Sequence, residues 1–246
     1  MGLPKIAVPE YSLTLPSNGK EIKYRPFLVK EEKILLIAME SEEPQQMVDA
    51  TKNVIKNCVF GDIDVDSLPT FDIEYIFLWL RAKSKGELIE LKYKCPECKG
   101  EIPLSMRVED IKMEYNEEHN AKIELAENLG VMMVYPNMSL QQKLDSLENE
   151  TQVNKIFKTV LLCIDYIYDA ENTYSSKDHT EKEMIDFVES LTDDQFQKIS
   201  NFFETMPKLR HKVQLNCQNK IKDKKKEKVC GYKEELVLEG LQSFFE

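Results

Sequence analysis

The sequence predicts an α+β protein, and three observations carry this prediction. Helical patterns come in blocks rather than in alternation with strands, as is typical of α+β proteins. A β-hairpin pattern precedes the first helical block. Two later hairpin patterns each contain two cysteines, Cys95 with Cys98 and Cys217 with Cys230. We therefore expect an N-terminal β-hairpin and helices, then a four-cysteine, zinc-ribbon-like antiparallel sheet with a helical insertion between its two knuckles.

The first hairpin is predicted within residues 11–27. Apolar and polar residues alternate on both sides of Asn18-Gly19, a dipeptide that favours the positive φ angles of a tight turn. Pro26 is expected to end the second strand.

Three helices are predicted next. Residues 29–41 place Leu35, Leu36 and Met39 on one apolar face. A second helix over 44–60 begins at a proline, which suits a first helical turn. The third helix, 69–86, is apolar all round its axis and is therefore expected to be buried, with Trp79 in the core.

Strands and helices then follow in separate groups. Thr180 with Glu183, and Thr192 with Gln195, have the spacing of capping boxes. The predicted strands cover residues 87–94, 101–107, 121–126, 131–135, 211–217 and 231–239, and the predicted helices cover 139–147, 150–168, 180–190 and 192–206.

The two cysteine pairs predict one structural zinc site. Each pair lies between two strand patterns with a glycine just after its second cysteine, Gly100 or Gly231, where the backbone is expected to turn sharply. Four thiolates at tetrahedral corners suit zinc in a closed, non-catalytic site. A redox pair would instead open a helix, which Gly100 and Pro103 disfavour.

The spacing of the second pair departs from a compact knuckle. Twelve residues separate Cys217 from Cys230. We expect this long tip to lose part of the backbone hydrogen bonding to sulfur. The gap between Cys98 and Cys217 is less of an obstacle, because closing a loop of that length costs only about 4 kcal/mol, against roughly 10–16 kcal/mol from structural zinc.

The other reactive side chains predict no catalytic site. Cys58 and Cys163 fall at apolar helical positions, where a thiol behaves as a small core residue. His119, His179 and His211 are each isolated among polar residues and are expected to be exposed to solvent. No phosphate-binding loop, nucleophile elbow or zinc-protease motif occurs, so we expect a protein that is not an enzyme and has no small-molecule substrate.

Composition and charge restrict the partners. No apolar run approaches the roughly 20 residues that cross a bilayer, and no signal peptide is recognised, so we expect no membrane contact and a reducing cytoplasm. The net charge of −11 makes a nucleic-acid partner unlikely in general. The exception is the lysine-rich stretch 220–228, which leaves a zinc-ribbon nucleic-acid-binding regulator as the alternative function.

Three stretches resemble the baseplate hub proteins of T-even-type contractile-tailed bacteriophages. They are "GKEIKYRPFLVKEEKILLIAMES" (19–41), the CPEC hairpin, and "CGYKEELVLEGLQSFF" (230–245). The resemblance implies a hub subunit or hub assembly protein that acts through contacts with other baseplate hub or tail proteins. It implies a place in the virion tail baseplate, after assembly in the host cytoplasm. Only the four cysteines carry over as a site.

These predictions divide the chain into four segments. They are residues 1–86, an N-terminal hairpin plus helical region; 87–138, the first zinc-knuckle hairpin and following strands; 139–206, a helical insertion; and 207–246, the second zinc-knuckle hairpin with an apolar C-terminal tail.

Overall fold

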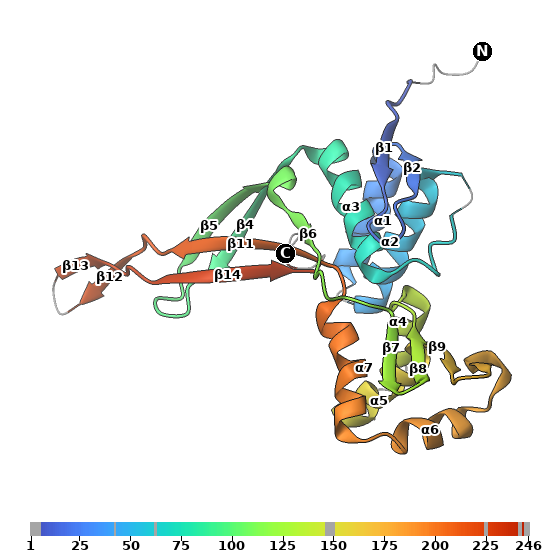
Figure 1. The fold of residues 1–246 in the computed structure, drawn as a ribbon. Coiled ribbons are helices and arrows are strands. Elements are labelled where there is room, and N and C mark those ends of the chain that lie inside the picture. Colours follow the sequence, from blue (N-terminus) through green and yellow to red (C-terminus); the bar gives the residue numbers. More distant parts are fainter. Residues whose placement is uncertain are drawn as a thin grey trace, which may run out of the picture. The chain divides into compact units, whose positions relative to one another are not determined.

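The structure, a computed structural model, has the predicted α+β class and contains two compact units (Figure 1). It describes residues 6–41, 43–61, 63–145, 151–223, 226–240 and 243. The first unit comprises Met1–Ile63, Phe71–Glu114 and Lys208–Glu246, and the second comprises Asp64–Thr70 and Tyr115–Pro207. Leu241, Phe244 and Phe245 of the predicted apolar tail lie outside the described residues.

The N-terminal hairpin of the first unit is confirmed. It consists of β1 (Tyr11–Thr14) and β2 (Glu21–Tyr24), which pair antiparallel, and β3 (Val59–Phe60) adds to the outer edge of β2. Of the predicted turn dipeptide only Gly19 has a positive φ, 69°, because the loop is longer than two residues and closes with a hydrogen bond from the Leu15 N–H to the Lys20 carbonyl.

The first two helices are α1 (Val29–Glu40) and α2 (Pro44–Cys58). The predicted apolar face of α1 is buried at Leu35 but not at Leu36 or Met39. The buried side chains are Glu31, Leu35 and Ala38, which share one stripe at the i, i+4, i+7 spacing, whereas Leu36 is 49% and Met39 56% exposed. The predicted extension of α2 to residue 60 is also wrong, because residues 59–60 pair with β2 instead.

The buried third helix is confirmed as α3 (Thr70–Lys85), and Gly86 ends it with a φ of 107°. Its buried Asp72 accepts hydrogen bonds from the backbone N–H and the hydroxyl of Ser17, which fixes the β1–β2 loop against the helix. Trp79 is only half-buried and packs at the edge of the core, with the Lys83 ammonium 5.8 Å from its ring centroid.

The two cysteine hairpins are present but do not merge into the predicted single sheet. The first is the pair β4 (Leu88–Lys94) and β5 (Glu101–Arg107). The second is the pair β11 (Lys208–Asn216) and β14 (Lys233–Glu239), and β6 (Lys112–Glu114), preceded by the short helix η1 (Val108–Asp110), occupies the other edge of β11. A separate hairpin, β12 (Lys220–Asp223) and β13 (Lys226–Val229), lies beyond the ends of β11 and β14 (Figure 1).

One apolar core joins the two cysteine hairpins to α3. Ile89 and Met106 of the first hairpin and Leu209 and Leu238 of the second pack with Leu78 of the helix, and all five are buried. The hairpins therefore share a core although they belong to different sheets.

The second unit contains a four-stranded antiparallel sheet, four α-helices and one short 3-10 helix among its described residues. The sheet order is β10-β9-β8-β7. The strands are β7 (Lys122–Ala126), β8 (Leu129–Met133), β9 (Ile164–Tyr168) and β10 (Thr173–Ser175), and the helices are α4 (Met138–Asp145), α5 (Gln152–Cys163), the short η2 (Ser176–Asp178), α6 (Glu181–Glu189) and α7 (Asp193–Thr205).

The predicted helix over 150–168 is wrong beyond Cys163. Residues 164–168 form β9, which is rich in β-branched and aromatic side chains that suit a strand, and β9 pairs with β8. The segment 139–206 is therefore not purely helical. Both predicted capping boxes, at Thr180 and Thr192, are confirmed. Within the described part of the chain, no helix has the length and apolar character needed to cross a membrane.

Candidate metal centre

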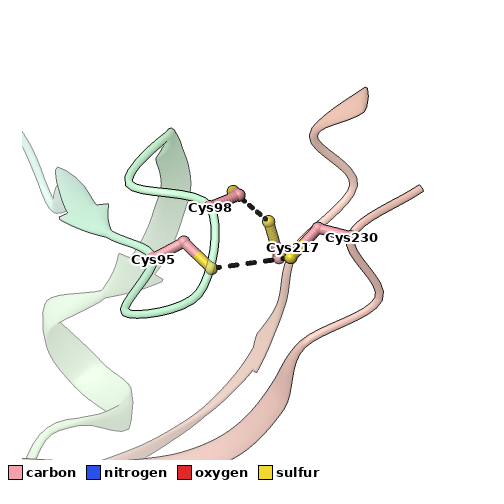
Figure 2. Close-up of side chains that lie close together, drawn as sticks. All are labelled: Cys95, Cys98, Cys217 and Cys230. Atoms are coloured by element: carbon pink, nitrogen blue, oxygen red, sulfur yellow. Dashed lines mark hydrogen bonds between the residues drawn. The ribbon is translucent and has the colours of Figure 1, made fainter. Parts of the chain in front are cut away.

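The structure brings the four predicted cysteines together within the first unit (Figure 2). The Sγ atoms of Cys95, Cys98, Cys217 and Cys230 all lie within 4.8 Å of one another. Two distances join the hairpins, 3.8 Å from Cys95 to Cys230 and 3.5 Å from Cys98 to Cys217. All four are free thiols, so the group is a set of possible ligands rather than two disulfides.

The first knuckle is a closed turn between β4 and β5. The Cys95 N–H donates to the Gly100 carbonyl at 2.9 Å, and the Lys99 N–H donates to the Cys95 carbonyl at 2.9 Å. These two bonds bring the backbone back on itself, so that both sulfurs point to the same side of the turn (Figure 2). Lys99 adopts a left-handed conformation, with a φ of 61°.

The second knuckle repeats this bonding pattern. The Cys217 N–H donates to the Tyr232 carbonyl at 2.8 Å, and the Gly231 N–H donates to the Cys217 carbonyl at 3.1 Å. Gly231 has a φ of 71° and corresponds to Lys99. The sharp turn predicted at Gly231 is therefore confirmed, but in the first knuckle the left-handed residue is Lys99 rather than Gly100.

The described residues between Cys217 and Cys230 include a hairpin of their own. β12 pairs with β13, and the pair next to the cysteines is Lys220 with Val229. The Cys230 N–H donates to the Asn219 carbonyl at 2.8 Å. The two ends of the insertion are therefore hydrogen-bonded to each other. This local pairing explains how a long insertion keeps the Cys217 and Cys230 sulfurs within 4.8 Å of each other.

The hydrogen bonding to the sulfurs also differs from the prediction. The sulfur of Cys217 accepts a hydrogen bond from the backbone N–H of Asn219, and the sulfur of Cys230 accepts one from the backbone N–H of Tyr232, which in each case is two residues later in the chain. Cys98 receives the equivalent bond from Gly100. The predicted loss of amide–sulfur bonding is therefore wrong, because the hairpin preserves the turn geometry at both of its ends.

The thiols have different acidities. The backbone N–H of Gly100 favours the thiolate and lowers the pKa of Cys98 to about 7. At Cys230 the Tyr232 N–H acts in the same direction, but burial and the neighbouring thiols outweigh it and raise the pKa to about 12. Burial also raises the pKa of Cys217. The Cys98 thiolate is thus available near neutral pH, whereas Cys217 and Cys230 need a nearby cation to favour ionisation.

The geometry and chemistry of this group fit a tetrahedral metal ion. With metal–sulfur distances of about 2.3 Å, the sulfurs of a tetrahedral zinc site lie about 3.8 Å apart, close to the separations found across the hairpins. Cys95 and Cys217 are fully buried, beside the buried Ile102 and the rings of Tyr93 and Tyr232. The four cysteines can therefore hold a metal in an apolar, closed setting.

The left-handed residue of the first knuckle allows a test of the turn geometry. Because an L side chain at positive φ is strained, replacing Lys99 with glycine is expected to raise the free energy of unfolding by about 0.5–1 kcal/mol and the melting temperature by a few degrees. Thermal unfolding checks this. Lys99→Ala is the control, since it removes the lysine but keeps the strain, and an equal gain in both variants would contradict the explanation.

The remaining cysteines lie where the sequence predicts. Cys58 and Cys163 are both fully buried, and burial raises the pKa of Cys58 to about 11 and that of Cys163 to about 12. They belong to the cores of the first and second unit respectively.

The histidine prediction is wrong for His119. Its two ring nitrogens lie 2.9 Å from the Thr205 hydroxyl and 2.9 Å from the Tyr135 hydroxyl, and its ring packs against Phe202. Burial lowers its pKa. His179 is exposed, as predicted, and His211 is half-buried with Nδ1 3.2 Å from the Asp110 carbonyl oxygen.

Comparison with known proteins gives one result that covers nearly the whole chain. A family model described as "T4 bacteriophage base plate protein" matches residues 8–246. Searches of curated proteins and of solved structures gave no match. The matched range includes both cysteine pairs and both compact units.

Proposed function

Because this chain belongs to the T4 bacteriophage base plate protein family, we propose that it is a structural or assembly protein of the tail baseplate hub. The observation that carries the proposal is the family match over residues 8–246. In this role the protein is not an enzyme. It acts in the virion tail, or in its assembly, through contacts with other baseplate hub or tail proteins.

The proposal includes a structural zinc ion held by Cys95, Cys98, Cys217 and Cys230. Supporting it are the four convergent sulfurs and the matching turn geometry of the two knuckles. When bound, the metal supplies a cross-link between two hairpins that lie 119 positions apart in sequence at their closest sulfurs. All four donors come from the protein, which leaves no position for a reacting water.

An apolar surface on α1 supports the proposal that this protein acts through contacts with other proteins. Val29 is 80% exposed, and Leu36, Ile37 and Met39 are each about half exposed on the same helix. Clusters of exposed large apolar side chains mark interaction sites in soluble proteins. We propose that this α1 surface (Val29, Leu36, Ile37 and Met39) contacts another hub or tail protein.

Two charges on the α1 surface should block assembly without unfolding the chain. Leu36→Glu together with Ile37→Glu is expected to change stability little, because both side chains are already about half exposed, but to reduce incorporation into tail assemblies at least 10-fold. Complementation of a phage lacking the protein measures this, with particle yield as the readout. The matched control is Gln197→Glu with Asn201→Glu, which adds the same charge to exposed positions of α7. Equal yields from both double variants would rule out the α1 contact.

Mass spectrometry directly tests whether this protein is located in the baseplate hub. The chain is expected in purified tails or in isolated hub intermediates, together with central baseplate proteins. Finding it only with peripheral baseplate parts would contradict the hub assignment, while leaving membership of the family untouched.

A further inference from the structure

One side chain outside the cysteine group contacts both knuckles. Asn219 follows Cys217 by two positions and stands at the start of the inserted hairpin. Its side-chain nitrogen Nδ2 lies 3.3 Å from the sulfur of Cys217 and 3.7 Å from the sulfur of Cys98. It also donates to the Glu101 carbonyl at 3.0 Å. A single amide group thus links the second knuckle, the first knuckle and the start of β5.

The backbone of Asn219 also forms two hydrogen bonds with the cysteines. Its carbonyl accepts the hydrogen bond of the Cys230 N–H, and its own N–H donates to the sulfur of Cys217. Asn219 therefore bonds to three of the four cysteines, from one place at the base of the β12–β13 hairpin.

The first knuckle has space for this amide because residue 100 is glycine. A Cβ atom added to Gly100 would lie 2.6 Å from the Asn219 Nδ2 and 2.9 Å from its Cγ. Gly100 does not have a positive φ, so its backbone conformation does not demand glycine. The close approach of Asn219 is then the reason why a side chain at position 100 is unfavourable.

We infer that Asn219 is a positioning residue for the metal centre, which donates N–H···S hydrogen bonds to one sulfur of each knuckle. This inference rests on the proposed zinc site. Donors to thiolate sulfur reduce the negative charge that a four-thiolate site concentrates, and outer-shell partners of this kind typically change metal affinity 10–100-fold. The same bonds fix the base of the inserted hairpin to the first knuckle, so the metal centre tolerates the twelve extra residues.

Zinc competition with a chromophoric chelator tests the inference on the full-length protein. Asn219→Ala is expected to lower zinc affinity 10–100-fold. Asn219→Asp, nearly the same shape, should lower it further, because a carboxylate beside thiolates repels them and donates no hydrogen bond. Gln218→Ala is the matched control, since this neighbouring amide bonds to Asn216 and not to a sulfur, and it should leave the affinity unchanged.

Cobalt substitution adds a readout that a merely structural role would not change. Loss of hydrogen bonds to sulfur makes the thiolates more electron-rich, so the sulfur-to-cobalt charge-transfer bands should move to longer wavelength in Asn219→Ala. Unshifted bands and wild-type zinc affinity in both Asn219 variants would overturn the role of Asn219 while leaving the zinc site intact. A wild-type protein that binds no zinc would overturn the proposed site and this inference together.

A double-mutant cycle checks the link to Gly100. Gly100→Ala should weaken zinc binding about as much as Asn219→Ala, because the new methyl group displaces the amide. In the Asn219→Ala background the same change should cost much less, since the obstructing side chain is gone. Additive losses would mean that Gly100 acts independently of Asn219 and would contradict the proposed contact.

Discussion

Replacing Cys95 and Cys98 together with serine is expected to abolish zinc binding and to lower the melting temperature of the protein by about 10 °C or more. Serine hydroxyls are poor zinc ligands compared with thiolates, and two remaining cysteines cannot form a closed site. The variant loses the connection between the β4–β5 hairpin and the β11–β14 hairpin at their cysteine ends.

The expected drop in melting temperature follows from the length of the loop that the metal closes. Cys98 and Cys217 lie 119 positions apart, and cross-linking a loop of this length restricts the unfolded chain by about 4–5 kcal/mol. For a protein of this size, 1 kcal/mol corresponds to about 2–4 °C. The apolar core shared by α3 and both hairpins remains, so the variant should still fold at low temperature.

The measurement combines metal analysis with calorimetry. Wild-type protein should contain about one zinc ion per chain, and the double variant none. Cys58→Ser is the control, because it introduces a hydroxyl at a fully buried position outside the four-cysteine group and should destabilise the protein without releasing zinc. An unchanged melting temperature in the double variant would show that the metal, if bound, has no structural role.

The cysteine hairpins could be predicted from the sequence because each is a local pattern. Alternating strands on both sides of a cysteine pair are visible within about 20 residues for the first hairpin and about 30 for the second, and the registers of β4 with β5 and of β11 with β14 confirm them. What could not be predicted was the division into two sheets. That depends on β6, a three-residue strand whose pairing with β11 spans nearly 100 positions in sequence.

The lysine-rich stretch shows why the details of the site were missed. Six lysines between Cys217 and Cys230 predict a solvated tip but not its secondary structure, because alternation is hard to recognise when nearly every residue is polar. The pairing of Lys220 with Val229 and of Ile221 with Lys228 shows that this stretch contains a hairpin. The signal for Asn219 was present only as an asparagine two residues after a cysteine, and its contact with Cys98 required the folded structure.

The wrong prediction for Leu36 and Met39 of α1 has a similar cause. Sequence periodicity assigns apolar residues to the core, but in α1 a carboxylate takes a core position because a charged partner reaches it from another element. The side chain of Glu31 is 1% exposed and lies 3.0 Å from the guanidinium of Arg25, at the end of the first hairpin. Leu36, Ile37 and Met39 are consequently left on the outside.

This buried ion pair supports the second large prediction. Replacing Glu31 with alanine is expected to lower the free energy of unfolding by about 3–5 kcal/mol, because it leaves the Arg25 guanidinium without its counter-charge in a largely buried position. It also removes the acceptor of the Leu28 N–H, which donates to Glu31 at 2.8 Å at the start of α1. Arg25 would keep its bonds to the Pro26 and Asn57 carbonyls, neither of which carries a charge.

Replacing Glu31 with glutamine separates the effect of the negative charge on stability from the effect of the hydrogen bonds. Glu31→Gln keeps an oxygen for the Leu28 N–H but loses the negative charge, so it should cost clearly less than alanine. The free energy of unfolding in urea at pH 7 gives both values. Equal losses for alanine and glutamine would assign the whole effect to the charge, and a loss below about 1 kcal/mol for alanine would show that the pair contributes little.

The pH dependence gives an independent check, and its sign follows from the pKa of Glu31. Burial acts to raise this pKa, but hydrogen bonds from Arg25 and from the Leu28 N–H outweigh it and lower the pKa below the ordinary value. The folded protein therefore binds the proton less tightly than the unfolded chain. The stabilisation is complete above the unfolded pKa of about 4.3 and is lost as the pH falls through the lower folded pKa.

The pKa of Asp72 is shifted in the opposite direction, so variants must be compared to isolate the contribution of Glu31 to stability. Burial raises the pKa of Asp72 despite its bonds from Ser17, and this favours the folded state as the pH falls. Because both proteins contain Asp72, its contribution cancels in the difference between wild type and Glu31→Gln. That difference should be constant above about pH 5 and shrink steadily towards pH 3. A difference that stays constant over this range would mean that the Glu31 charge does not stabilise the fold, and that packing alone keeps this carboxylate in the core.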